Sequence, residues 1–184
     1  MIEEAIEVGR LLFRSGLIDG ASGNLSFREG DRIVITRSGA ALYDLKPEDF
    51  VEVSSEKAST DRLVHKKIYE ISPFSCVLHC HGVFNVVLSL KLDRIVPADL
   101  EGRLFFGELE VVDGEFGSES YAEKVAEVVS RRKIAIARGH GIYVAANDFR
   151  EAFNLANYAE HSCEVLYYLK LLDKLEHRES REKF

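Results

Sequence analysis

The sequence lacks tryptophan and has few prolines and few cysteines, three of each among 184 residues. The cysteines, Cys76, Cys80 and Cys163, lie within apolar patterns and share no paired spacing. An odd number of unpaired positions argues against a disulfide framework, so we expect free, buried thiols. Free thiols indicate a reducing compartment.

Long apolar runs and an excess of positive charge are also missing. No stretch approaches the ~20 consecutive apolar residues that a membrane-spanning helix needs. Lys and Arg number 24 against 31 Asp and Glu, which gives a net charge of −7, and the basic residues are scattered. We therefore expect neither a nucleic-acid nor a membrane partner. The first residues, MIEEAIEVGRLLF, carry acidic side chains where a signal peptide carries basic ones, which predicts a cytoplasmic protein.

The apolar content of 46% predicts one domain over residues 1–184. Helical periodicity or helix-start signals predict helices at 2–15, 61–71 with a cap at Ser59 or Thr60, 82–91, 118–132 with a capping serine, and 148–175. Extended patterns predict strands at 25–27, 32–36, 51–53, 75–81 and 104–112, and two more strands within 133–146 that bend around Gly139, His140 and Gly141. Hairpin strands mixed with helices predict an α/β fold, in which helices sandwich a mainly antiparallel or mixed central sheet in three layers.

Two histidines stand where one predicted strand leaves the core, in SCVLHCHGVF. Side chains alternate along a strand, so His79 and His81 point to one face and Cys80 to the other. Zinc accepts histidine nitrogens and is commonly held by three protein ligands in catalytic sites. His140, between two glycines in RGHGIY, is the best candidate for the third ligand. The alternative is a pair of structural histidines with hydrogen-bond partners.

Three loops are rich in glycine, serine or threonine: GASGNLS, TRSGAA and SSEKAST. Backbone amides in such turns can form concave anion sites, to which hydroxyl groups add donors. Each loop alone is typical of an ordinary turn, and none matches a nucleotide-binding fingerprint. Together with a candidate metal site, the three loops favour an anionic, oxygen-rich substrate.

The order of these motifs along the chain resembles the class II aldolase/adducin family, and its fuculose-phosphate aldolases in particular. The resemblance runs through GASGNLSFR, ITRSGAAL, STDRLVHKKIYE, VLHCHGVF and RGHGIY. It implies an α/β sandwich and a homotetramer with active sites at the subunit contacts. It further implies zinc, or another divalent metal, on His79, His81 and His140, with Asp61 as acid/base and as a fourth ligand without substrate. The implied phosphate-binding residues are Gly23, Asn24, Ser38, Gly39, Ser59 and Thr60.

The resemblance implies a class II aldehyde-lyase acting on a small phosphorylated sugar. Such an enzyme reversibly cleaves a ketose 1-phosphate, similar to L-fuculose 1-phosphate, into dihydroxyacetone phosphate and an aldehyde. The metal stabilises the enediolate that forms when the carboxylate removes a proton from carbon.

The sequence departs from the aldolase pattern at two places. Asp61 stands where the familiar aldolases carry glutamate, whereas related ribulose-phosphate 4-epimerases carry aspartate there. Glu101 and its neighbours occupy a region from which the fuculose enzyme presents a tyrosine to the aldehyde. The alternatives are therefore an L-ribulose-5-phosphate 4-epimerase-like enzyme, a methylthioribulose-phosphate dehydratase, and a non-catalytic adducin-like head, which would lack the metal ligands.

Overall fold

The computed structural model describes the backbone of residues 1–181 and the side chains of residues 1–176. Its centre is an eight-stranded sheet in the order β3-β2-β1-β4-β8-β7-β6-β5. All neighbouring strands pair antiparallel except β6 and β7, which run parallel. The strands are β1 (Asn24–Glu29), β2 (Arg32–Thr36), β3 (Phe50–Glu52), β4 (Cys76–Cys80), β5 (Arg94–Ile95), β6 (Leu109–Val112), β7 (Ile134–Ala137) and β8 (Gly141–Ala146).

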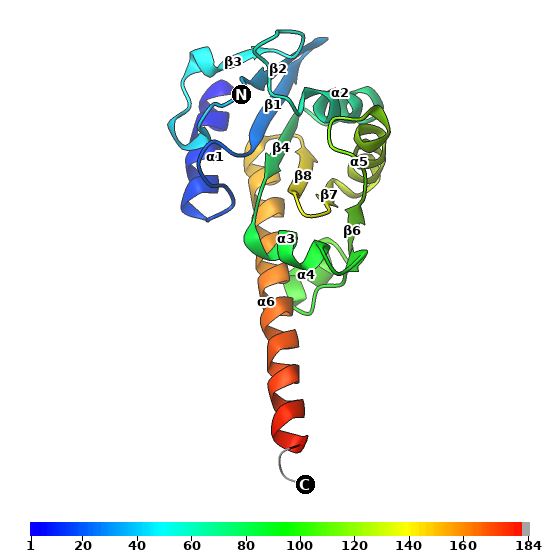
Figure 1. Cartoon of the computed structure of the whole chain (residues 1–184). Coiled ribbons are helices and arrows are strands. Elements are labelled where there is room, and N and C mark those ends of the chain that lie inside the picture. Colours follow the sequence, from blue (N-terminus) through cyan, green and yellow to red (C-terminus); the bar gives the residue numbers. More distant parts are fainter. Residues whose placement is uncertain (182–184) are drawn as a thin grey trace.

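Helices cover both faces of this sheet (Figure 1). One face packs on α1 and on the first part of α6, and the opposite face packs on α2 and α5. The final helix continues well beyond the body of the molecule (Figure 1). The helices are α1 (Ile2–Arg14), α2 (Arg62–Ile71), α3 (Val83–Ser89), α4 (Leu100–Phe105), α5 (Glu119–Arg132) and α6 (Phe149–Arg181), with short 3-10 turns η1 (Leu42–Asp44) and η2 (Pro47–Asp49).

The central strand β4 shows why the two faces have separate cores. Cys76, Leu78 and Cys80 belong to the core beneath α1 and α6, whereas Val77 belongs to the core beneath α2 and α5. This is the two-residue alternation of a pleated strand that is buried on both sides. His79 follows the same alternation and therefore lies on the α2 and α5 face.

The predicted fold class is confirmed, since helices flank a mixed, mainly antiparallel sheet. The three cysteines are free and buried, as expected. Ser118 caps α5 by accepting a hydrogen bond from the Tyr121 backbone N–H at 3.2 Å, which confirms the predicted capping serine. Within the described residues, no helix is long and apolar enough to cross a membrane.

Three details of the predicted elements were wrong. The strand predicted at 104–112 is the end of α4 followed by β6, because Asp99 caps a helix by accepting from the Gly102 N–H at 2.8 Å. The N-cap of α2 is Asp61 rather than Ser59 or Thr60. The last helix continues past residue 175 to Arg181, the last residue whose backbone is described. The two-residue strand β5 was not predicted.

Candidate active site

The site begins with the pairing of β4 and β8. His79 on β4 lies directly opposite Tyr143 on β8, and the next pair along joins Cys80 to Ile142. The Nδ1–H of His79 donates a hydrogen bond to the Ile142 carbonyl oxygen at 2.9 Å, since a carbonyl can only accept. In a neutral imidazole this leaves the lone pair on Nε2. The strand pairing thus fixes both the orientation and the tautomer of His79.

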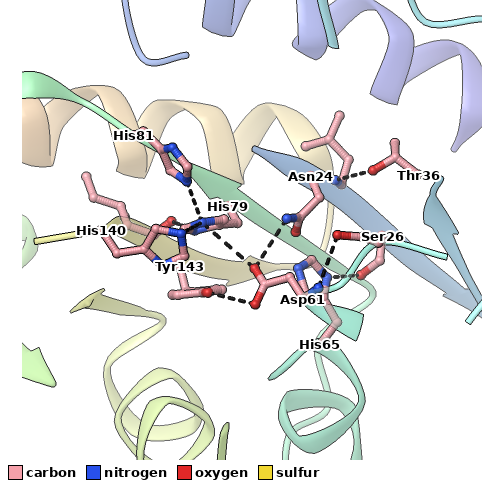
Figure 2. Close-up of polar contacts among 12 residues, drawn as sticks. Asn24, Ser26, Thr36, Asp61, His65, His79, His81, His140 and Tyr143 are labelled. Atoms are coloured by element: carbon pink, nitrogen blue, oxygen red, sulfur yellow. Dashed lines mark hydrogen bonds and ion pairs between the residues drawn. The ribbon is translucent and has the colours of Figure 1, made fainter. Parts of the chain in front are cut away.

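Three imidazoles converge at this point (Figure 2). The Nε2 atom of His79 lies 2.8 Å from Nε2 of His81 and 3.4 Å from Nε2 of His140. His81 follows the end of β4, where its backbone N–H donates to the Leu17 carbonyl oxygen at 2.7 Å. His140 lies in the turn between β7 and β8. The structure therefore brings together the three histidines that the sequence singled out.

This cluster has the chemistry of a divalent metal site. The possible ligand atoms all lie within 4.8 Å of one another, and nitrogens around a tetrahedral zinc ion lie about 3.3 Å apart. The Nδ1 bond of His79 to a carbonyl oxygen is the kind of outer contact that orients metal-bound histidines. The residues present fit such an ion, and their role as ligands stays a prediction.

Burial keeps the three imidazoles neutral. It lowers the pKa of His79 well below its ordinary value, and the two neighbouring histidines add to the shift. Burial, with a smaller contribution from His81, lowers the pKa of His140 to about 4. Burial also lowers the pKa of His81. Because the neutral form is the form that binds metal, the cluster is ready to accept a cation near neutral pH.

Asp61 lies beside the histidines, at the N-cap of α2 (Figure 2). Its side chain is 3% exposed, and its Oδ2 is 3.8 Å from Nε2 of His79. Asn24 donates to Oδ2 at 3.2 Å, and the Tyr143 hydroxyl donates to Oδ1 at 2.8 Å. Burial raises the pKa of Asp61 to about 6, although these two hydrogen bonds act to lower it. The carboxyl group can therefore gain and lose a proton near neutral pH.

A hollow of about 210 Å³ joins these groups to the three loops. Every residue that the sequence marked for the metal, the substrate phosphate or proton transfer lines it: Gly23, Asn24, Ser38, Gly39, Ser59, Thr60, Asp61, His79, His81 and His140. The structure thus collects residues from five separate segments around one space. Their individual roles stay predictions.

Two glycines let backbone segments approach closely at this hollow. At Gly23, whose φ is +78°, a Cβ atom would lie 2.7 Å from the His79 carbonyl oxygen. At Gly141 a Cβ atom would lie 2.2 Å from the Cys80 carbonyl oxygen. The residue that follows His140 therefore has no room for a side chain.

Sequence reasoning missed three residues of the site. Arg37 lines the hollow next to Ser38, and its Nε donates to Asp49 at 2.7 Å. Phe116 lines it too, with its ring edge-on to His140 at a centroid distance of 5.1 Å. Tyr143 does not line the hollow, but it contacts both His79 and Asp61 from the buried side of the site. Arg37 had a local signal, a cation within a glycine and serine loop, whereas the position of Tyr143 depends on strand register.

Glu101, which the sequence placed in the region of the aldehyde, lies exposed on α4 and does not line the hollow. Two other histidines, His65 and His161, lie on helices. His65 is fully buried on α2, and its Nδ1 is 2.6 Å from the Ser26 hydroxyl. His161 is exposed on α6. Neither belongs to the metal cluster.

Comparisons with known proteins identify the family. Residues 3–167 match the model of the class II aldolase and adducin N-terminal domain. An L-fuculose phosphate aldolase of Methanocaldococcus jannaschii is 27% identical over 180 residues, covering 94% of this chain and 98% of the relative. A crystal structure of L-fuculose-1-phosphate aldolase from Thermus thermophilus is 31% identical, with a TM-score of 0.89 and coverage of 94% and 95%.

The chain therefore belongs to the class II aldolase and adducin N-terminal domain family, whose class II aldolases are lyase-type enzymes that are generally metal-dependent. Its relatives differ in the reaction that they catalyse. A 5-methylthioribulose-1-phosphate/5-deoxyribulose-1-phosphate aldolase of Rhodospirillum rubrum is 30% identical over 170 residues, covering 86% of this chain and 76% of the relative. A relative from Acidiphilium cryptum, 29% identical over 173 residues, is named methylthioribulose-1-phosphate dehydratase.

The histidine cluster predicts a bound metal. Protein purified without added zinc should contain about one divalent ion per chain by elemental analysis. His79→Ala should lose it, because His79 is the central member of the cluster, whereas His161→Ala on the exposed face of α6 should retain it. A folded wild-type chain without metal, or equal metal in His79→Ala, would contradict the site.

His65 predicts how stability depends on pH. Burial lowers the pKa of His65 to about 3, so the folded chain leaves it neutral. An unfolded chain, in which the histidine pKa is about 6.5, takes up the proton as the pH falls. The free energy of unfolding should therefore fall between pH 7 and pH 5 by about 2 kcal/mol more in the wild type than in His65→Gln.

Urea unfolding at both pH values measures this difference. His161→Gln, which changes an exposed histidine, serves as the control and should follow the wild-type dependence. If His65→Gln loses as much stability as the wild type on acidification, then His65 is not held neutral by burial.

Proposed function

We propose that this chain is a zinc-dependent sugar-phosphate aldolase, which reversibly cleaves a ketose 1-phosphate into dihydroxyacetone phosphate and an aldehyde. One observation carries the proposal: a single hollow is lined by three loops rich in glycine and hydroxyl groups, three histidines whose pKa burial lowers, and a carboxyl group with a raised pKa. Two relatives named as fuculose phosphate aldolases, at 27% and 31% identity, support a ketose similar to L-fuculose 1-phosphate.

The three loops would bind the phosphate group. They bring Ser38, Ser59 and Thr60 to the hollow, where hydroxyl groups and backbone N–H groups would donate to the phosphate oxygens. Arg37 adds positive charge to the same wall, and Asp49 holds its guanidinium in place at 2.7 Å. A guanidinium suits the oxygens of a phosphate because it presents several N–H donors in one plane.

His79, His81 and His140 would hold the metal. An ion bound there supplies Lewis acidity toward the carbonyl and hydroxyl oxygens of the substrate. Three nitrogen ligands are the set that zinc takes in catalytic sites, and Asp61 is near enough to complete the set before substrate binds. The neutral ligands leave the positive charge of the ion undiminished.

Asp61 would transfer the proton. In the condensation direction its carboxylate accepts the proton from the carbon next to the carbonyl, and the electron pair left behind forms the new bond to the aldehyde carbon. The aldehyde oxygen becomes a hydroxyl by taking up a proton. In the cleavage direction the protonated carboxyl group returns its proton to that carbon. A pKa of about 6 makes the carboxylate a stronger base than an ordinary aspartate at ~3.9.

We also propose a homotetramer with active sites at the subunit contacts. Large apolar side chains of α4 are exposed in the single chain, among them Leu100, Leu104 and Phe105, at 65%, 74% and 55%. A contact that covers them would place the Glu101 region of one subunit against another subunit. Three free, buried thiols favour the cytoplasm as the compartment, and the whole of residues 1–184 would act as one domain.

Two other reactions have support of their own. Asp61 in place of glutamate favours a 4-epimerase acting on pentulose 5-phosphates. The names of two relatives favour a methylthioribulose-phosphate dehydratase. A non-catalytic adducin-like head has less support, because all three candidate ligands and the carboxylate surround the hollow.

Product analysis distinguishes these reactions. The full chain should join dihydroxyacetone phosphate to an aldehyde from a panel of short hydroxyaldehydes and alkyl aldehydes, giving a ketose 1-phosphate that mass spectrometry and chromatography identify. His79→Ala should form no product, because it removes the central candidate ligand.

Three results would contradict an aldolase. Interconversion of ribulose and xylulose 5-phosphates without carbon–carbon bond formation would identify an epimerase. Loss of water from methylthioribulose 1-phosphate would identify a dehydratase. Inactivity of the metal-loaded chain on all three substrate classes would favour the non-catalytic interpretation.

Arg37 should contribute to phosphate binding. Arg37→Gln should raise KM for the sugar phosphate roughly tenfold, with a smaller change in kcat, because it removes a charge-assisted contact from the wall of the hollow. The control is Arg32→Gln, which removes an exposed arginine paired with Glu52 at the other end of β2. Steady-state kinetics measure both variants. An unchanged KM in Arg37→Gln would show that Arg37 does not contact the phosphate.

A further inference from the structure

Tyr143 is a buried residue that contacts both the candidate base, Asp61, and a candidate metal ligand, His79. Its hydroxyl donates to Oδ1 of Asp61 at 2.8 Å. Its ring stacks on the imidazole of His79, with centroids 4.0 Å apart and planes 13° from parallel. Its side chain is fully buried and does not line the hollow. Tyr143 therefore reaches the site from behind and cannot touch a substrate there.

The sheet determines this arrangement. Tyr143 on β8 and His79 on β4 are directly paired, so both side chains project from the same face of the sheet. Asp61 lies over that face at the start of α2 (Figure 2). A one-residue shift of β8 against β4 would turn Tyr143 to the opposite face, away from His79 and Asp61. The contact between Tyr143 and Asp61 is thus as well specified as the central sheet.

The hydrogen bond to Tyr143 selects the orientation of the carboxyl group. The terminal torsion of an aspartate is broad, so the side chain alone does not choose which oxygen faces the metal ligands. With Oδ1 held by Tyr143, Oδ2 lies 3.8 Å from Nε2 of His79 and accepts from Asn24 at 3.2 Å. Without the hydroxyl, Oδ1 would lose its partner at a buried position.

We propose that Tyr143 is the positioning residue for Asp61, holding the carboxyl group so that Oδ2 faces the histidine cluster that lines the hollow. The inference rests on the proposed function for its effect on catalysis. It also accounts for a short acid at this position. A glutamate would extend the carboxyl group by about 1.5 Å, into the space of the Tyr143 hydroxyl.

Tyr143→Phe tests the effect on catalysis. It keeps the ring against His79 and removes only the hydroxyl that holds Asp61. We expect kcat to fall roughly tenfold, because a misplaced base slows the chemical step, while KM stays within about twofold because the phosphate loops are untouched. The control is Tyr69→Phe, which removes another buried phenol hydroxyl. This hydroxyl lies 2.9 Å from the Ser26 hydroxyl and makes no hydrogen bond to Asp61. Its kcat should stay within about twofold of the wild type.

A double-mutant cycle tests whether Tyr143 acts through Asp61. Asp61→Glu alone should crowd the Tyr143 hydroxyl and reduce kcat sharply. Asp61→Glu combined with Tyr143→Phe frees that space and should recover at least tenfold of the lost kcat. Two independent residues would instead give multiplied losses, and that result would overturn the proposal.

Melting temperatures compare the wild type, the two single variants and the double variant without any measurement of activity. After removal of metal with a chelator, Asp61→Glu should melt about 4 °C lower than the wild type, and adding Tyr143→Phe should recover at least half of this loss. If the wild type has no aldolase activity, the proposed function fails, and the melting temperatures still decide whether the residues are coupled. If the changes in melting temperature add and the fold-losses in kcat multiply in the double variant, Tyr143 does not position Asp61.

Discussion

The hydrogen bond from His79 to the Ile142 carbonyl oxygen is the interaction on which the rest of the site depends. It exists because β4 and β8 pair antiparallel in one register, and it fixes the imidazole with its lone pair turned outward. The same register brings the turn that carries His140 beside His79 and places Tyr143 beneath Asp61. Two short central strands therefore position the candidate metal ligands and orient the candidate base.

Burial is the second constraint, because it sets the protonation states. His79 and Asp61 are 1% and 3% exposed, and removing a charged group from water is unfavourable. The histidines respond by staying neutral, and the carboxyl group responds with a pKa of about 6. Each response suits chemistry near neutral pH, where a metal needs neutral nitrogen ligands and a base needs a pKa close to the working pH. The hydrophobic cores on the two faces of the sheet offset the cost of this burial.

Much of the fold and the site could be predicted from local patterns, and the failures have physical reasons. Strand alternation placed His79 and His81 on one face, and loop composition indicated the walls of the hollow. The apolar run at 104–106 fits a strand as well as a helix, and only the Asp99 cap decides for the helix. Asp61 occupies an N-cap position, but its side chain makes no capping bond and turns to Tyr143 and Asn24 instead. Tyr143 could not be assigned, since its neighbours depend on pairing between strands that are more than 60 residues apart.

The central claim is that one hollow binds a metal and a sugar phosphate side by side. Crystals of the metal-loaded chain soaked with dihydroxyacetone phosphate test it directly, with anomalous scattering measured at the zinc absorption edge. We expect one anomalous peak bounded by the Nε2 atoms of His79, His81 and His140, and phosphate density against the loops at 23–24, 38–39 and 59–60. A peak elsewhere, or a phosphate bound away from these loops, would contradict it.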